Sequence, residues 1–383
     1  MVNEIHIKPF FDYKGGNISG VAANSGQAAN SAFVFMVHSL MNKFKEVVHI
    51  VPVHKPNVEF LHKLLREVIC GLEKNGFKVI CIVTDNNAIN RKAMLPYKPT
   101  VVPAIPTSSP KSPTNDFVFS HPCDAQRPLF FVIDPVYILK CVRNNWLKTN
   151  DQCFSFPAFK PDETGQRQML YAYFKTIKAA YELECDQLLR YGYTVSRKAV
   201  PPSDIRKKNV QLALQVFSES GPNALRAIGT KHQLKHCEET ASFMETIVKC
   251  WKIVNVKTPF RGARFRDDFN KPVFPSERDL KLSFLYDFLD WLEYWKEKQA
   301  DTCKLTKDTH GALQQTTQAL IEICRYCFDQ LHMSFVLLGQ FQTDLLEDRF
   351  GRYRRLAGSQ YHVSIRQLYE EETKLRLQNT LPK

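Results

Sequence analysis

Hydrophobic positions in the first third of the chain follow a strand period in most segments and a helix period in one. Short apolar or alternating runs bounded by turn residues predict strands at 5–11, 18–23, 33–37, 47–53, 77–84, 117–119 and 129–133. The first two runs flank the turn residues 12–17, which predicts a hairpin, and the run 33–37 also fits a helix. Residues 60–72 repeat apolar positions at helical spacing until Asn75 and Gly76 end the helix.

Beyond residue 136 the pattern becomes almost wholly helical. Helices are expected over 170–189, 210–217, 240–254 and 280–295. The run 77–84 is nearly all apolar, as expected for a strand in the middle of a sheet that is covered on both faces. The sequence therefore predicts an α/β sheet unit, interrupted by a long helical segment and followed by further helices.

Residues 98–115 have a different composition, with five prolines among serines and threonines. Such a segment cannot form a regular element, so we expect an exposed, mobile loop there.

The charge of the chain points to an anionic partner. Of its 383 residues, 52 are Lys or Arg and 39 are Asp or Glu, which gives a net charge of +13. Each phosphate that a basic protein neutralises releases bound counterions, so nucleic acid suits this surplus. A membrane surface is the weaker alternative, because neither an amphipathic basic helix nor a lipidation motif is evident. The N-terminus does not resemble a signal peptide, and a membrane-spanning run is not expected.

The eleven cysteines are scattered, mostly within apolar runs, as is typical of reduced, buried thiols in an intracellular protein. Cys324 and Cys327 form one C-x-x-C pair. Without a second pair at zinc-finger spacing, their separation fits the core face of a helix better than a zinc site.

Two groups of carboxylates are candidates for chemistry. Asp85 follows the predicted central strand, and ligands collect at the carboxyl ends of strands in α/β sheets. An ordinary turn or helix N-cap is the alternative interpretation. Far downstream, Asp344 and Glu347 would share one helix face. Without further context, these acids fit a solvated face on which they pair with the arginines that follow.

Three segments, in this order along the chain, resemble motifs of P-element-type DNA transposases. Residues 82–92 (IVTDNNAINRK) are similar to the second-acid motif, and residues 340–354 (QFQTDLLEDRFGRYR) to the third-acid motif. Residues 131–145 (FVIDPVYILKCVRNN) resemble the D-P-x-H-x-x-K-x-x-R-N-N segment, with Tyr137 at the histidine position. Helical stretches such as 251–257 resemble the family's GTP-binding insertion.

The resemblance implies an RNase H-like mixed sheet with a large all-α insertion domain. The expected domains are 1–147, with the proline-rich loop 98–115, then the insertion at 148–316, then C-terminal helices at 317–383. The family cuts and joins phosphodiesters with two Mg²⁺ ions held by three carboxylates, and it uses GTP as a cofactor that is not hydrolysed. By resemblance, the catalytic positions are Asn3, Asp85 and Glu347, of which Asp85 and Glu347 are acidic metal ligands.

Asn3 is the departure that matters for function, because the family has aspartate there. An amide oxygen can still touch a metal, but the site loses one negative charge, and Glu4 should point to the opposite face of the strand. We therefore expect impaired catalysis. The alternative is a non-catalytic, transposase-derived protein that binds DNA or a partner. The resemblance further implies a nuclear homo-oligomer, without the family's N-terminal zinc finger.

Basic residues provide the candidate cofactor and DNA contacts. Lys140 and Arg143 are candidates to bind the GTP phosphates, with a solvated helix face as the alternative. Phe260 and Phe265 alternate with basic residues, a composition suited to backbone contact and base stacking on DNA. The predicted DNA-binding residues of this cluster are Lys257, Arg261, Arg264 and Arg266. Residues 206–208 form a second basic cluster, and either cluster also fits an ordinary solvated surface.

Overall fold

The computed structural model describes residues 1–98, 118–276, 278–298, 302–359 and 361–380. These residues form two compact units. The first unit comprises Met1–Asp134 and Phe341–Lys383, and the second comprises Pro135–Gln340. The predicted insertion at 148–316 lies within the second unit. The proline-rich loop predicted at 98–115 lies, except for Lys98, outside the described residues.

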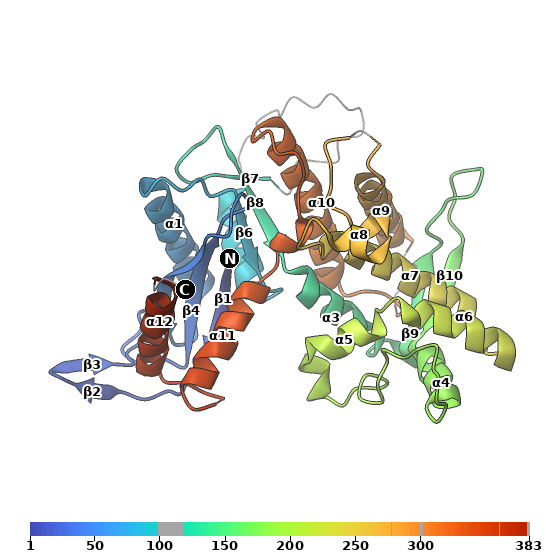
Figure 1. The fold of residues 1–383 in the computed structure, drawn as a ribbon, viewed down its shortest axis with the longest axis horizontal. Helices are drawn as coiled ribbons and strands as arrows, with labels where there is room; N and C mark the ends of the chain where they lie inside the picture. The colour runs from blue at the N-terminus through green and yellow to red at the C-terminus, as the bar shows by residue number, and fades with distance from the viewer. Residues whose placement is uncertain (99–117, 277, 299–301, 360, 381–383) are drawn as a thin grey trace. The chain divides into compact units, whose positions relative to one another are not determined.

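The first unit has a mixed sheet built from two three-stranded groups (Figure 1). One group has the antiparallel order β1–β4–β5, with β1 at Val2–His6, β4 at Ser31–His38 and β5 at Lys45–Val53. The other has the order β6–β8–β7, with β6 at Cys81–Thr84, β8 at Pro128–Ile133 and β7 at Val118–Ser120. Strands β6 and β8 are parallel, and β1 contacts β6. This arrangement confirms the predicted RNase H-like mixed sheet.

The predicted hairpin between residues 5–11 and 18–23 is wrong. Strand β1 pairs with β4, where Ile5 lies opposite Ala32 and both side chains are buried in the core. A separate small hairpin, β2 (Asp12–Lys14) and β3 (Asn17–Ser19), turns through Gly15 and Gly16 at positive φ. Burial of β1 against the sheet thus decides its partner, and the turn residues serve a shorter ribbon.

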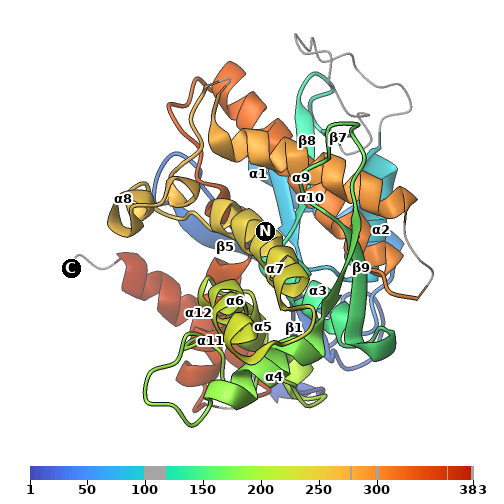
Figure 2. The ribbon, with the colours of Figure 1, turned by 90° about the vertical axis from the view of Figure 1, so that its right-hand side faces the viewer.

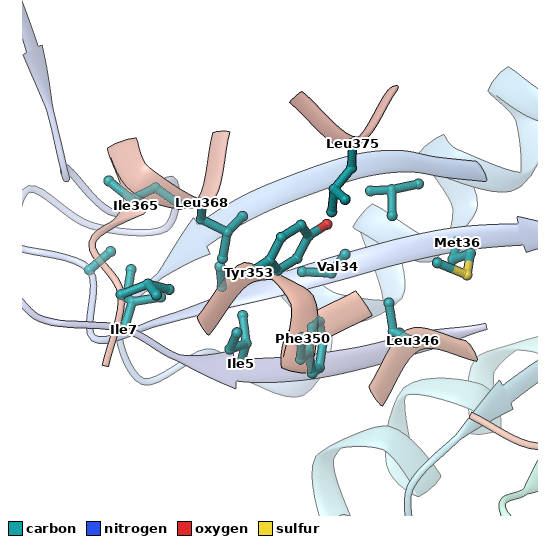
Figure 3. Close-up of a cluster of buried hydrophobic side chains, with 14 of the residues drawn as sticks. Ile5, Ile7, Val34, Met36, Leu346, Phe350, Tyr353, Ile365, Leu368 and Leu375 are labelled. Atoms are coloured by element: carbon teal, nitrogen blue, oxygen red, sulfur yellow. The ribbon is translucent and has the colours of Figure 1, made fainter. Parts of the chain in front are cut away.

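Helices α11 (Asp344–Leu356) and α12 (Ile365–Thr380) cover one face of this sheet (Figure 3). Leu346, Phe350 and Tyr353 recur at helical spacing on α11 and pack on Ile5 and Val34. Complete burial of each such side chain contributes about 1.5–3 kcal/mol. The apolar stripe therefore fixes which face of α11 meets the sheet, and with it the direction of the polar residues between. The first unit also contains helices α1 (Val58–Lys74) and α2 (Ala88–Met94), the former N-capped by Asn57 as its sequence favours.

The second unit is mostly helical (Figure 2). Its helices are α3 (Pro135–Trp146), α4 (Phe174–Glu184), α5 (Val210–Val216), α6 (Ser220–His232), α7 (Cys237–Val254), α8 (Arg261–Phe265), α9 (Leu280–Glu297) and α10 (Lys307–Asp329). Cys324 and Cys327 are fully buried on α10. Among the described residues, no helix is both long and apolar enough to cross a membrane.

One part of the insertion departs from the all-helical expectation. Residues predicted as the start of a helix at 170 form strand β10 (Met169–Tyr173), which pairs with β9 (Cys153–Pro157). The indole N–H groups of Trp291 and Trp295 on α9 donate to the carbonyl oxygens of Pro157 and Ser155, both at 2.6 Å. These long-range bonds satisfy backbone acceptors of β9, a stabilisation that local periodicity does not reveal.

Candidate functional site

Two aspartates follow the carboxyl ends of the parallel strands β6 and β8. Thr84 and Ile133 are opposite each other in the register, so Asp85 and Asp134 leave the sheet side by side. The Asp134 N–H donates to the Thr84 carbonyl oxygen at 2.7 Å, which extends the ladder by one bond. The sequence predicts a functional site at this edge of the sheet.

Asp85 is held by local hydrogen bonds. Its Oδ1 atom accepts from the Asn87 backbone N–H at 3.0 Å and from the Asn90 Nδ2 group at 2.6 Å. The N-cap of α2 is Asn87, whose side chain accepts from the Ile89 N–H. Asp85 therefore lies in the turn before the helix, as one of the two alternative interpretations has it, and does not cap the helix. Asn90 is buried and orients the carboxylate, a role that sequence reasoning missed.

Asp134 connects the sheet to the helix that carries Glu347. It is 1% exposed, and its Oδ2 atom accepts from the backbone N–H of Thr343 at 2.9 Å and from its hydroxyl at 2.5 Å. Thr343 immediately precedes α11 and itself accepts from the Glu347 N–H at 3.0 Å. A buried carboxylate thus anchors the first turn of α11 at its N-terminal, positive end. The sequence signals Asp134 by its position at the end of an apolar strand and as the aspartate of the D-P-x-H segment.

Asn3 and Glu347 meet directly. The Asn3 Nδ2 group donates to Glu347 Oε1 at 2.5 Å, and Asn3 Oδ1 accepts from the Glu4 backbone N–H at 2.8 Å. Asn3 is 5% exposed, whereas Glu347 is half-buried. A flipped amide would turn its oxygen to the carboxylate and its NH₂ group to another donor, so both contacts fix the amide orientation.

This orientation does not suit a divalent cation. The Asn3 amide presents to Glu347 Oε1 an N–H donor, which cannot ligate a metal. The only oxygen of the Asn3 side chain faces the backbone of Glu4. No group of three His, Cys, Asp or Glu side chains arranged to hold a metal is found among the described residues. The residues present therefore do not form the three-carboxylate site that two Mg²⁺ ions require.

Arg349 and Arg352 of α11 each pair with a carboxylate other than Glu347. Arg349 forms two hydrogen bonds with the buried Glu372 of α12, at 2.9 and 2.8 Å, and Tyr353 donates its hydroxyl to the same carboxylate at 2.5 Å. Burial alone would raise the pKa of Glu372, but the hydrogen bonds from Arg349 and Tyr353 outweigh it and lower this pKa. Asp348, also on α11, forms a solvated pair with Arg352 at 3.0 Å.

The two predicted phosphate ligands differ in their surroundings. Lys140 is half-buried on α3, with its Nζ atom 4.3 Å from the ring centre of Tyr137. Arg143 is fully buried and donates to Asn144 Oδ1 at 2.9 Å and to the Lys207 carbonyl oxygen at 2.7 Å. Its Nη1 atom has no hydrogen-bond partner, and burial lowers the pKa of Arg143 to about 10. Arg143 is thus neither on a solvated face nor open to a ligand in this conformation.

The predicted DNA-binding cluster lies around α8. Lys257, Arg264 and Arg266 are exposed, as is the aromatic ring of Phe260. Arg261 is half-buried, and its Nη1 group donates to the Asn255 carbonyl oxygen at the end of α7 at 3.0 Å. Three of the four basic residues are therefore accessible to a partner, while Arg261 braces the helix end. In the second cluster, the 3₁₀ turn Arg206–Lys208, Lys207 pairs with Asp204 at 2.8 Å.

Comparisons with known proteins agree with this architecture. Residues 1–97 match the family "TNP-like, RNase H N-terminal domain", and residues 137–267 match "TNP-like, GTP-binding insertion domain". The "Transposable element P transposase" of Drosophila melanogaster is 21% identical over 299 residues, which are 78% of this chain. The chain spans 35% of that relative's length.

A solved structure supports the same assignment at the level of the fold. The structure titled "Drosophila P element transposase strand transfer complex" matches 99% of this chain and 77% of its own, at 18% identity and a TM-score of 0.76. The two domain matches, in order along one chain, together span more than half of its residues. The chain therefore belongs to the family of P-element-type transposases, with an RNase H-like unit and a GTP-binding insertion domain.

Proposed function

We propose that this chain is a P-element-like DNA transposase core that binds DNA and GTP but cleaves and transfers DNA strands poorly. The observation that carries the proposal is the hydrogen bond from Asn3 Nδ2 to Glu347 Oε1 at 2.5 Å. Asp85 and Glu347 stand at the second and third acidic positions, and Asn3 at the first. The fold of a strand-transferring enzyme is thus combined with an incomplete set of carboxylates.

The amide impairs the site in two ways. It removes one negative charge from a site that must hold divalent cations, whose hard character demands anionic oxygen ligands. It also donates a hydrogen bond to the carboxylate that such a cation would need. Mg²⁺-dependent phosphodiester chemistry, which would rely on metal activation of the attacking oxygen, is therefore expected to be weak in this chain.

Binding of DNA does not depend on the missing carboxylate. The net charge of +13 and the exposed side chains of Lys257, Arg264 and Arg266 support contact with the phosphate backbone. Transposon ends are the DNA that this family suggests. A protein that acts on chromosomal DNA and holds two ends would work in the nucleus as a homo-oligomer, and we propose both for this chain.

For GTP, the support comes from the matched insertion domain and from the charge on α3. Lys140 and Arg143 are three positions apart and share one helix side. Lys140, the more accessible of the two, would contact a phosphate group. Arg143, whose buried Nη1 atom lacks a partner, would influence the site through the backbone of Lys207. Lys140→Ala should therefore weaken GTP binding in calorimetry while leaving the thermal unfolding of the protein unchanged.

The decisive experiment compares the natural chain with Asn3→Asp in nicking of terminal-repeat DNA, with Mg²⁺ or Mn²⁺. We expect little nicking by the natural chain and a gain of at least about tenfold in Asn3→Asp, corresponding to about 1.4 kcal/mol of barrier. Robust nicking by the natural chain would refute impairment by Asn3.

The same comparison addresses a second candidate function, a non-catalytic protein that binds DNA. The Asn3–Glu347 hydrogen bond favours it too, because it stabilises the fold without a metal. If Asn3→Asp folds and binds the DNA but remains inactive, the non-catalytic function is the better description. Asn3→Asp combined with Glu347→Gln is the matched control, because it restores the charge at position 3 but removes the third carboxylate.

A further inference from the structure

Two cysteines far apart in the sequence meet at the surface of the first unit. The Sγ atoms of Cys70, on α1, and Cys123, between β7 and β8, lie 2.7 Å apart. They are separated by 53 residues along the chain. A disulfide bond is about 2.05 Å long, so these sulfurs need to approach by less than one ångström to form one.

The surrounding structure holds the two backbones together. Glu73, one turn after Cys70 on α1, accepts a hydrogen bond from the Arg127 Nη2 group at 2.6 Å. The side chain of His121 is buried against Glu73, with 3.3 Å between Nε2 and Oε1, and its Nδ1 atom accepts from the Cys123 backbone N–H at 3.2 Å. The segment that carries Cys123 is thus fastened to α1 by contacts independent of the sulfurs. The thiols meet because the scaffold places them, which is the preorganisation that a cross-link requires.

The pair is accessible to small reagents, unlike the buried cysteines of the chain. Cys123 is exposed and Cys70 is partly exposed, whereas Cys324 and Cys327 are fully buried in α10. Partial burial and the hydrogen bond with Cys70 raise the pKa of Cys123 to about 11. Cys123 is therefore a protonated thiol at neutral pH, and its reactivity as a nucleophile should increase as the pH rises.

We propose that Cys70 and Cys123 form a thiol modification site that closes to a disulfide by exchange with low-molecular-weight disulfides such as oxidised glutathione. In the first step, the thiolate of one cysteine attacks a sulfur of glutathione disulfide, forms a mixed disulfide and releases one glutathione thiolate. The second cysteine loses its proton and attacks the protein sulfur of that mixed disulfide, which releases the second glutathione. The protein loses two protons and two electrons, and one glutathione disulfide is reduced to two glutathione molecules.

The cross-link would join α1 to the segment that leads into β8. Closing a loop of this length restricts the unfolded chain, so the thermal midpoint of the first unit should rise by about 5 °C on oxidation. The proposal concerns only the first unit and does not depend on DNA cleavage or GTP binding.

The test uses the full chain, fully reduced and then equilibrated with mixtures of reduced and oxidised glutathione. Free thiols are alkylated, and the digested protein is examined by mass spectrometry. We expect a Cys70–Cys123 cross-linked peptide pair to dominate, with the other nine thiols alkylated. The single variants Cys70→Ser and Cys123→Ser should each accumulate the glutathione mixed disulfide at the remaining cysteine, because the second step is blocked. Cys185→Ser, which removes a partly exposed cysteine elsewhere, should close as the natural chain does.

Four outcomes would overturn the proposal. The first is that Cys70 and Cys123 of the natural chain stay reduced, and are therefore alkylated, under conditions that oxidise a dithiol peptide. The second is a stable glutathione adduct on either cysteine without closure. The third is a dominant cross-link between another pair, such as Cys153 and Cys303. A redox-dependent thermal midpoint that persists in Cys70→Ser would likewise exclude this pair as its cause.

Discussion

The side chains of Asn3 and Glu347, 344 residues apart, are joined by a hydrogen bond of 2.5 Å between strand β1 and helix α11. In a site of three carboxylates, these two positions would repel each other unless a cation lay between them. Here the amide supplies the attraction. The pair therefore joins β1 to α11 by a hydrogen bond.

We predict that Asn3→Asp makes the stability of the protein dependent on divalent cations. Two carboxylates would replace a donor and an acceptor, at a cost of about 2–3 kcal/mol without metal. Mg²⁺ or Mn²⁺ should then raise the thermal midpoint of the variant, because a ligand that binds only the folded state stabilises it. The natural chain should show no such increase in differential scanning fluorimetry.

Two variants serve as controls for this measurement. Asn3→Asp with Glu347→Gln should lose the metal response, whereas Asn3→Asp with Asp348→Asn should retain it, because Asp348 is exposed and pairs with Arg352. An equal response of the natural chain and Asn3→Asp to Mg²⁺ would contradict the interpretation.

A second prediction concerns the anchor of α11. Thr343→Val keeps the shape of the side chain but removes the hydroxyl that donates to Asp134, so urea unfolding should show a loss of about 1–3 kcal/mol. Asp134→Asn should also be destabilising. The free energy of unfolding should fall less in the double variant than the sum of the two single decreases, with a coupling energy of about 0.5–3 kcal/mol. Thr343→Ser, which retains the hydroxyl, is the control, and strict additivity would mean that the two residues act independently.

A third prediction is a loss of stability in acid that depends on Glu372. The pKa of this carboxyl is lowered in the folded state from its ordinary value of 4.5. A group of this kind stabilises fully above its unfolded pKa, and the contribution is lost as the pH falls through the folded pKa. The thermal midpoint should therefore fall below about pH 4.5.

Glu372→Gln should flatten this pH dependence and cost about 3–5 kcal/mol at neutral pH, because it leaves Arg349 buried with a weaker partner. Glu370→Gln, which affects the exposed Arg366–Glu370 pair of the same helix, should change stability by less than about 1 kcal/mol. An unchanged acid profile in Glu372→Gln would assign the loss to other carboxylates.

A fourth prediction separates contact with DNA from support of the fold. Replacing Arg264 and Arg266 by alanine should weaken DNA binding and reduce the dependence of log K on log salt by about 0.9 for each phosphate that the protein no longer neutralises. Arg261→Ala should mainly destabilise the protein, because its side chain braces the end of α7. Lys178→Ala, on α4, is the matched control for the loss of an exposed charge. If the slope of log K against log salt concentration is equal in all variants, the α8 cluster is excluded as a DNA-binding surface.

Local patterns in the sequence predicted the elements that their own apolar spacing defines. The apolar spacing at 60–72 and the stop at Asn75 correspond to α1, and the run 129–133 corresponds to β8. The pattern did not predict β10, because its strand geometry depends on pairing with β9 rather than on its own periodicity. Pairing of β1 with β4 likewise depends on burial across the sheet, not on the nearby turn.

The resemblance to a family identified Asn3, Asp85 and Glu347 as related positions, but not their contacts. The orientation of the Asn3 amide depends on Glu4 and on a helix more than 300 residues away, which no short motif encodes. The same is true of Arg143, whose helical spacing fits a surface position although tertiary packing buries it.

The bond between Asp134 and Thr343 also has a consequence for how such a protein can change. The last residue before the insertion and a residue just after it touch, so the chain leaves the RNase H-like unit and returns to it at one point. The residues from Pro135 to Gln340 are thus an insertion in the RNase H-like unit, and the contact between Asp134 and Thr343 does not constrain their number. Evolution or an engineer could replace this insertion by another domain, or by a short linker, while Glu347 remained opposite Asn3.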